Sequence, residues 1–119
     1  MSDTSQAIDF SKLNALVVED DAGGMAIIGV MMRHLGIKCF INTTGDGVIA
    51  MGNAMKPPPD VIFLDINLPR TTGYEILKAI RADEKLKHKI VVAVTAQDAD
   101  TEIPKAKEKG MAGFIGKTT

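Results

Sequence analysis

Five short apolar runs, each stopped by a polar residue, constrain this chain more than any other feature. They span residues 13–18, 37–42, 61–64, 90–94 and 112–116. Runs of this length are typical of strands that are buried on both faces. Between them, apolar residues recur at helical spacing, which predicts four helices. The alternation indicates an α/β domain whose parallel sheet has helices on both faces.

Capping and breaking residues predict where the helices begin and end. Asp21 is the expected N-cap of the first helix, and Gly36 is its expected C-cap. The prolines at 57–59 should end the second helix, because proline has no amide hydrogen. We expect the fourth helix to begin at Thr101 as N-cap, with Pro104 in its first turn.

Length and composition limit the class of protein. The 119 residues suit one domain, expected at 12–119 after a loose leader at 1–11. The net charge of −1 and the lack of a basic stripe argue against nucleic acid as a direct partner. The longest apolar run, 25–32, is too short for membrane insertion, and no signal peptide is evident. Cys39 is the only cysteine, so a reduced, cytoplasmic setting and a small buried side chain are expected.

Polar residues with catalytic potential follow four of the five runs. Glu19 and Asp20 follow the first run, Asp65 the third, Thr95 the fourth and Lys117 the fifth. The carboxyl ends of parallel strands meet at one edge of the sheet, where ligands of such folds bind. We therefore expect these five side chains to lie close together.

The residue types at this edge favour phosphoryl transfer. Clustered carboxylates repel one another, so a cation must compensate for them. A hard divalent ion such as Mg²⁺ prefers oxygen ligands and often binds carboxylates together with phosphate oxygens. Lys117 can supply a further positive charge, and the Thr95 hydroxyl can donate to a phosphoryl oxygen. Positioning and charge neutralisation are what phosphoryl transfer requires.

Four segments resemble the receiver domains of response regulators. They are Val17-Val18-Glu19-Asp20, Leu64-Asp65-Ile66-Asn67-Leu68-Pro69 with Gly73, Val94-Thr95-Ala96 and Gly113-Phe114-Ile115-Gly116-Lys117. The resemblance covers roughly residues 12–117. It implies a flavodoxin-like, doubly wound sheet with strand order 2-1-3-4-5, which the alternation alone does not give.

The resemblance also implies a role for each residue around the acidic cluster. Asp65 is similar to the phosphoacceptor of the family. Asp20 matches the acid that holds Mg²⁺ directly, and Glu19 the one that acts through water. The backbone carbonyl of Asn67 is expected to complete the metal site.

Further residues match the switch and the charge partner of the family. Thr95 matches the hydroxyl that moves toward the phosphoryl group, and Lys117 the lysine that pairs with it. Phe114 occupies the position of an aromatic rotamer switch. The implied partner is a histidine kinase or a histidine phosphotransfer protein. The phosphorylated chain would then form a homodimer or bind a downstream effector. The chain would act on its own phosphorylation and dephosphorylation only, and would not be a turnover enzyme.

The sequence departs from the family pattern at three places. Thr118 follows Lys117 where many receivers have proline, so a trans bond is expected there. The chain stops at Thr119, before the usual fifth helix, which should leave an apolar strip exposed beside the first and fifth strands. Pro104 should shorten the fourth helix, whose surface many receivers use for contacts.

Two other functions are compatible with parts of the pattern. A degenerate receiver could act purely as a docking module, although the intact acidic cluster speaks against this. A phosphohydrolase of the haloacid dehalogenase type also uses an Asp at a strand end. Such enzymes need a second acid two residues later, and Asn67 at that position cannot protonate a leaving group.

Overall fold

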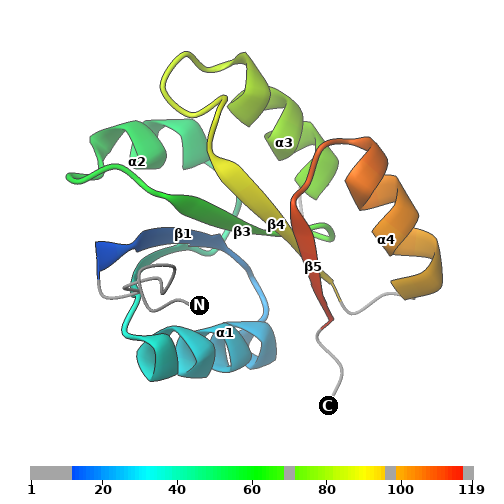
Figure 1. The fold of residues 1–119 in the computed structure, drawn as a ribbon, viewed down its shortest axis with the longest axis horizontal. Helices are drawn as coiled ribbons and strands as arrows, with labels where there is room; N and C mark the ends of the chain where they lie inside the picture. The colour runs from blue at the N-terminus through cyan, green and yellow to red at the C-terminus, as the bar shows by residue number, and fades with distance from the viewer. Residues whose placement is uncertain (1–11, 69–71, 96–98, 117–119) are drawn as a thin grey trace, which may run out of the picture.

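A five-stranded parallel sheet forms the middle layer of the molecule, and helices pack on both of its faces (Figure 1). The computed structural model describes residues 12–68, 72–95 and 99–116. The strands are β1 (Asn14–Val18), β2 (Lys38–Asn42), β3 (Val61–Asp65), β4 (Ile90–Thr95) and β5 (Gly113–Gly116). The helices are α1 (Ala22–Leu35), α2 (Val48–Ala54), α3 (Gly73–Ala82) and α4 (Ala99–Glu108). The strand order β2-β1-β3-β4-β5 confirms the flavodoxin-like order.

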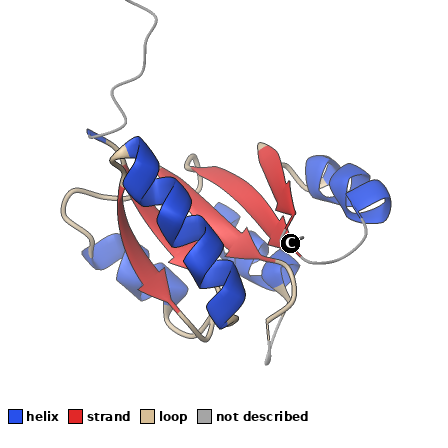
Figure 2. Ribbon diagram, turned by 90° about the horizontal axis from the view of Figure 1, so that it is seen from below, coloured by secondary structure: helices blue, strands red, loops and turns tan. Residues whose placement is uncertain are grey.

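The alternation of side chains along β1 gives each face of the sheet its own core. All five residues of β1 are buried. Leu16 and Val18 pack in the core cluster shared with α2, α3 and α4. Ala15 and Val17 pack with Ile28 of α1 on the opposite face. α1 lies alone on its face among the described helices, as Figures 1 and 2 both show.

Both predicted caps of α1 are confirmed. The side chain of Asp21 accepts a hydrogen bond from the Gly24 amide at 2.8 Å, which satisfies a backbone donor of the first turn. Gly36 ends the helix with φ of 77°, a left-handed conformation that favours glycine. Among the described residues, no helix is both long and apolar enough to cross a bilayer.

The predicted start of α4 is wrong. The helix begins at Ala99, so Thr101 lies inside it and Pro104 falls in the second turn. Capping propensity is a weak signal that tertiary packing can override. Thr101 lies in the first turn and is exposed, whereas Glu102 and Ala106 of the same helix are buried.

β2 forms one edge of the sheet, and its side chains are less buried than the sequence pattern suggests. Cys39 is half-buried and is therefore not the fully buried residue that was expected. Phe40 and Ile41 are exposed. An edge strand has a neighbour on one side only, so less of its surface is covered.

Apolar side chains are uncovered on the α1 side of β3, β4 and β5. Ile90 is 54% exposed, and Val61, Val92 and Ile115 are half-buried next to the core of that face. These four residues form what we call the apolar strip. It was expected beside the first and fifth strands, and it includes Ile115 of β5 and Val61, which pairs with Ala15 of β1. The strip therefore lies over β3 to β5.

We expect the 119-residue chain to self-associate through the apolar strip, because contiguous exposed apolar surface favours association. Ile90→Lys should shift sedimentation toward the monomer, since the contact would desolvate the new charge. Val30→Lys is the matched control, because Val30 is 55% exposed on α1 and lies outside the strip. A wild-type chain that stays monomeric at high concentration, or equal effects of the two substitutions, would contradict this.

Candidate functional site

Three carboxylates meet at the carboxyl ends of β1 and β3, which are neighbouring strands. Asp65 is the last residue of β3, and Glu19 and Asp20 directly follow β1. One carboxylate oxygen from each residue lies within 4.8 Å of the other two. Glu19 and Asp65 are 0% and 1% exposed, whereas Asp20 is exposed. The sheet thus brings together the three acids that the sequence predicted.

This carboxylate cluster fits a hard divalent cation. Like charges at this separation repel, and burial strengthens the repulsion because it lowers the effective dielectric constant. All of the donors are oxygens, which are the ligands that Mg²⁺ prefers. The cluster therefore offers a donor set that such an ion could use.

Backbone contacts around Asn42 hold Glu19 in place. The Glu19 amide donates to the Asn42 carbonyl at 3.0 Å, and Glu19 Oε2 accepts from the Asp21 amide at 3.1 Å. The side chain of Asn42 accepts from the Gly45 amide at 2.7 Å and donates to the Asp46 carbonyl at 2.7 Å. Asn42 is buried, and sequence reasoning did not single it out. The only feature of the sequence that could have pointed to Asn42 is that it is a polar residue at the end of an apolar run.

Asn67 links the end of β3 to the end of β4. Its amide donates to Asp65 Oδ1 at 3.0 Å, which fixes the rotation of that carboxylate. Its side-chain nitrogen donates to Thr95 Oγ1 at 3.3 Å. Thr95 is fully buried, so this side-chain bond has little competition from water. Sequence reasoning gave Asn67 only a role for its backbone carbonyl and missed the role of its amide side chain.

Thr95 and Phe114 lie on the same face of the sheet. Phe114 is paired with Ala93, two residues before Thr95 on β4, so the alternation of the strand places them together. Phe114 is half-buried against the core of the α2, α3 and α4 side. Lys117 and the bond to Thr118 lie outside the described residues.

Gly73 allows the start of α3 to approach the strand end that carries Asp65. The Gly73 amide donates to the Ile66 carbonyl at 2.7 Å. A Cβ atom at this position would lie 2.8 Å from Ile66 Cα and 3.1 Å from the Asp65 carbonyl carbon. Backbone atoms cannot turn aside, so only glycine fits here.

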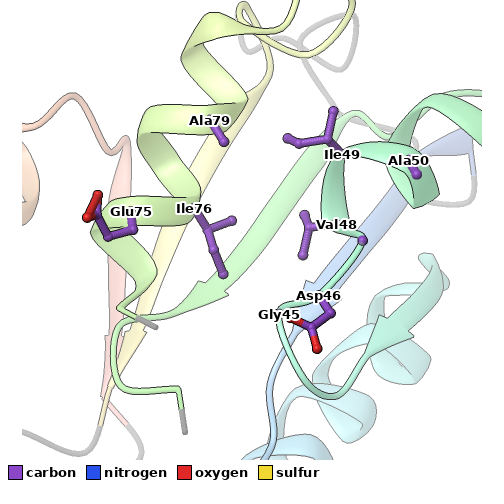
Figure 3. A pocket seen from close by; sticks show the side chains of 9 residues that line it. Gly45, Asp46, Val48, Ile49, Ala50, Glu75, Ile76 and Ala79 are labelled. Carbon is purple, nitrogen blue, oxygen red and sulfur yellow. The ribbon is translucent and has the colours of Figure 1, made fainter. Parts of the chain in front are cut away.

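A shallow hollow of about 470 Å³ lies beside the site, between the turn after β2 and helix α3. Figure 3 shows Val48 and Ile76 facing each other across it, with Asp46 at one end. Its floor is the apolar core, because both Val48 and Ile76 are buried. None of the three clustered carboxylates lines it, so it is separate from the candidate metal site.

Comparisons with known proteins agree with this arrangement. The model of the response regulator receiver domain family matches residues 15–119. Chemotaxis protein CheY of Pseudomonas aeruginosa is 36% identical over 107 residues, covering 88% of this chain and 84% of the relative. The polar-differentiation response regulator DivK of Brucella ovis is 30% identical over 104 residues, covering 87% of this chain and 83% of that relative.

A solved structure shows the same fold. It is the N-terminal domain of a response regulator receiver protein from Methanoculleus marisnigri, with a TM-score of 0.78 and 25% identity. The match covers 91% of this chain and 86% of that structure. Fold and acidic cluster together define an α/β signalling module of the doubly wound type. The chain belongs to the response regulator receiver domain family of two-component systems.

Gly73→Ala should lower the free energy of unfolding by about 1–3 kcal/mol, because the added methyl group overpacks against backbone. Gly29→Ala is the control. Gly29 lies inside α1 with nothing within 4 Å of a Cβ there, so alanine should stabilise by about 0.5–1 kcal/mol. Urea unfolding followed by circular dichroism measures both values. A Gly73→Ala variant as stable as the wild type would refute the close approach.

Proposed function

We propose that Asp65 accepts a phosphoryl group from the phosphohistidine of a histidine kinase or a histidine phosphotransfer protein. The observation that carries this proposal is the position of Asp65 at the end of a buried strand, within 4.8 Å of two other carboxylates. A rigid strand holds an attacking group in alignment better than a mobile loop does. Residues 12–119 would form the receiver domain, with 1–11 as its leader.

The transfer would convert the carboxylate into an acyl phosphate. A carboxylate oxygen of Asp65 attacks phosphorus in line with the leaving nitrogen. The bond between phosphorus and nitrogen breaks, and the histidine ring of the donor keeps the electron pair. The Asn67 amide supports this step, because its 3.0 Å hydrogen bond to Oδ1 orients the carboxylate.

Mg²⁺ would be held by Asp20, Asp65 and the backbone carbonyl of Asn67, with Glu19 acting through a water molecule. The ion would neutralise the charge of the phosphoryl oxygens. Lys117 would add a fixed positive charge beside the acyl phosphate. The chain would thus assist its own phosphorylation and dephosphorylation without turning over a metabolite.

Thr95 and Phe114 would report the modification to the rest of the domain. The phosphoryl group adds about −1.5 to −2 charges and new acceptor oxygens. These oxygens would draw the Thr95 hydroxyl away from Asn67, whose side chain now donates to it at 3.3 Å. Phe114 lies on the same face of the sheet and would enter the space that Thr95 leaves.

The relatives support a signalling role, because their names describe a chemotaxis protein and a polar-differentiation regulator. By analogy, the phosphorylated chain would be recognised by a downstream effector or by a second copy. The family membership favours this over metabolite hydrolysis.

Magnesium should stabilise the folded chain, because an ion that binds only the folded state raises its stability by mass action. At tenfold excess over the dissociation constant, the gain is about 1.4 kcal/mol. Thermal melts with and without millimolar MgCl₂ measure this. Asp20→Asn should lose the gain, whereas Glu108→Gln, which removes an exposed acid outside the cluster, should keep it. Unchanged midpoints for the wild type would contradict the metal site.

Acetyl phosphate with MgCl₂ should add one phosphoryl group to the chain, located on Asp65 by intact mass and peptide mapping. Asp65→Asn should lose the adduct and keep the fold. Thr95→Ala should still form the adduct. Its backbone amide NMR signals should shift less on phosphorylation than those of the wild type.

Each other outcome has a distinct meaning. A folded, magnesium-binding chain without any adduct would indicate a docking module. An adduct on another residue would reject Asp65 as the acceptor, and rapid turnover of phosphate esters would indicate a hydrolase.

A further inference from the structure

A cleft between α3 and α4 combines an apolar floor with several cationic side chains. Its volume is about 520 Å³, within the usual range of ligand pockets. Lys78, Arg81 and Lys109 line it together with Tyr74 and Leu77. None of the clustered carboxylates around Asp65 belongs to its lining, so this is a second, separate feature.

The ring of Tyr74 contacts the ammonium groups of two lysines at the cleft. The Nζ atoms of Lys105 and Lys109 lie 5.7 and 5.3 Å from the centre of its ring, within the range of cation–π contacts. The Tyr74 hydroxyl donates to Glu102 Oε1 at 2.9 Å. Burial and the contact with Glu102 raise the pKa of Tyr74 to about 12, so the hydroxyl stays protonated and the contact between α3 and α4 persists.

Arg81 adds a third fixed cation to the cleft. Its guanidinium donates to the carbonyls of Lys87, Lys89 and Gly110 at 3.1, 2.8 and 3.1 Å. These carbonyls satisfy its donors and immobilise it, but they are neutral and leave its charge in place. The side chain would therefore lose little conformational entropy on binding an anion.

In the described part of the chain, cationic side chains outnumber carboxylates around this cleft. None of the four cations (Lys78, Arg81, Lys105 and Lys109) forms an ion pair there. Glu75 lines the cleft and Glu102 accepts from the neutral Tyr74 hydroxyl, so these two carboxylates offset two of the four positive charges. Four like charges around one cleft repel one another, and an anionic partner would relieve this repulsion.

We propose that the cleft between α3 and α4 docks an acidic segment of a partner protein. Its Asp or Glu side chains would lie against Lys78, Lys105 and Lys109, and an apolar side chain would rest on Tyr74 and Leu77. An acidic peptide suits the cleft better than a nucleic acid, because a peptide can place an apolar side chain on Leu77 and Tyr74. The docking does not depend on phosphorylation of Asp65.

Titration of the ¹⁵N-labelled full chain with a capped synthetic peptide tests this proposal. The peptide carries several glutamates around one leucine, and a second peptide has glutamine in place of each glutamate. We expect amide shifts centred on Tyr74, Lys78 and Lys109 with the acidic peptide only, and weaker binding as salt is added.

Matched variants separate the cleft from general charge attraction. Lys78→Gln with Lys109→Gln should raise the dissociation constant about fivefold, because each exposed ion pair contributes a factor of roughly two to five. Lys38→Gln with Lys56→Gln removes the same charge at the β2 edge of the sheet and should have little effect, because Lys38 begins β2 and Lys56 lines a hollow with Phe40 of β2.

Three results would overturn the proposal. The first is no shift at millimolar peptide, and the second is an equal loss of affinity in both double variants. The third is that a short single-stranded oligonucleotide shifts the same amides at a lower concentration than the peptide does. That result would assign the cleft to nucleic acid.

Discussion

Glu19, Asp20 and Asp65 each place one carboxyl oxygen within 4.8 Å of the other two, and two of these residues are almost completely buried. Such an arrangement is unfavourable without compensation, so the surrounding structure must hold the carboxylates against their repulsion. β1 and β3 do this because both are central strands with buried cores on each face. In the proposed function, a bound cation would compensate for this repulsion.

The neighbours of the cluster explain how its charge can affect the rest of the domain. Asn67 contacts Asp65 through its backbone amide and Thr95 through its side chain, so one residue joins the ends of β3 and β4. Gly73 brings α3 close to the Asp65 backbone. Tyr74 then follows in α3 and contacts Glu102 of α4. Asn67 and Gly73 thus connect the carboxylate cluster to the end of β4 and to the start of α3.

Local signals in the sequence predicted much of this fold. Short-range patterns predicted the strand ends, the caps at Asp21 and Gly36, and the sheet edge where Asp65 lies. The structure agrees with these predictions. The start of α4 at Ala99 was not predicted, because the capping preference of a residue such as Thr101 does not by itself fix a helix boundary.

The remaining features required the tertiary structure. The contact from Asn67 to Thr95 spans 28 positions, so the sequence gives no sign of it. The cations of the α3–α4 cleft are spread between positions 78 and 109, and a search for a basic stripe cannot find them.

Beryllofluoride binding tests the central claim most directly, because this phosphoryl analogue needs an acceptor carboxylate and a divalent cation together. ¹⁹F NMR of the chain with BeF₃⁻ and Mg²⁺ should show a bound signal at one equivalent. Asp65→Asn, or removal of Mg²⁺ by a chelator, should abolish that signal. A bound signal that persists in folded Asp65→Asn, or its absence in the wild type, would contradict the account of Asp65 as the phosphoacceptor.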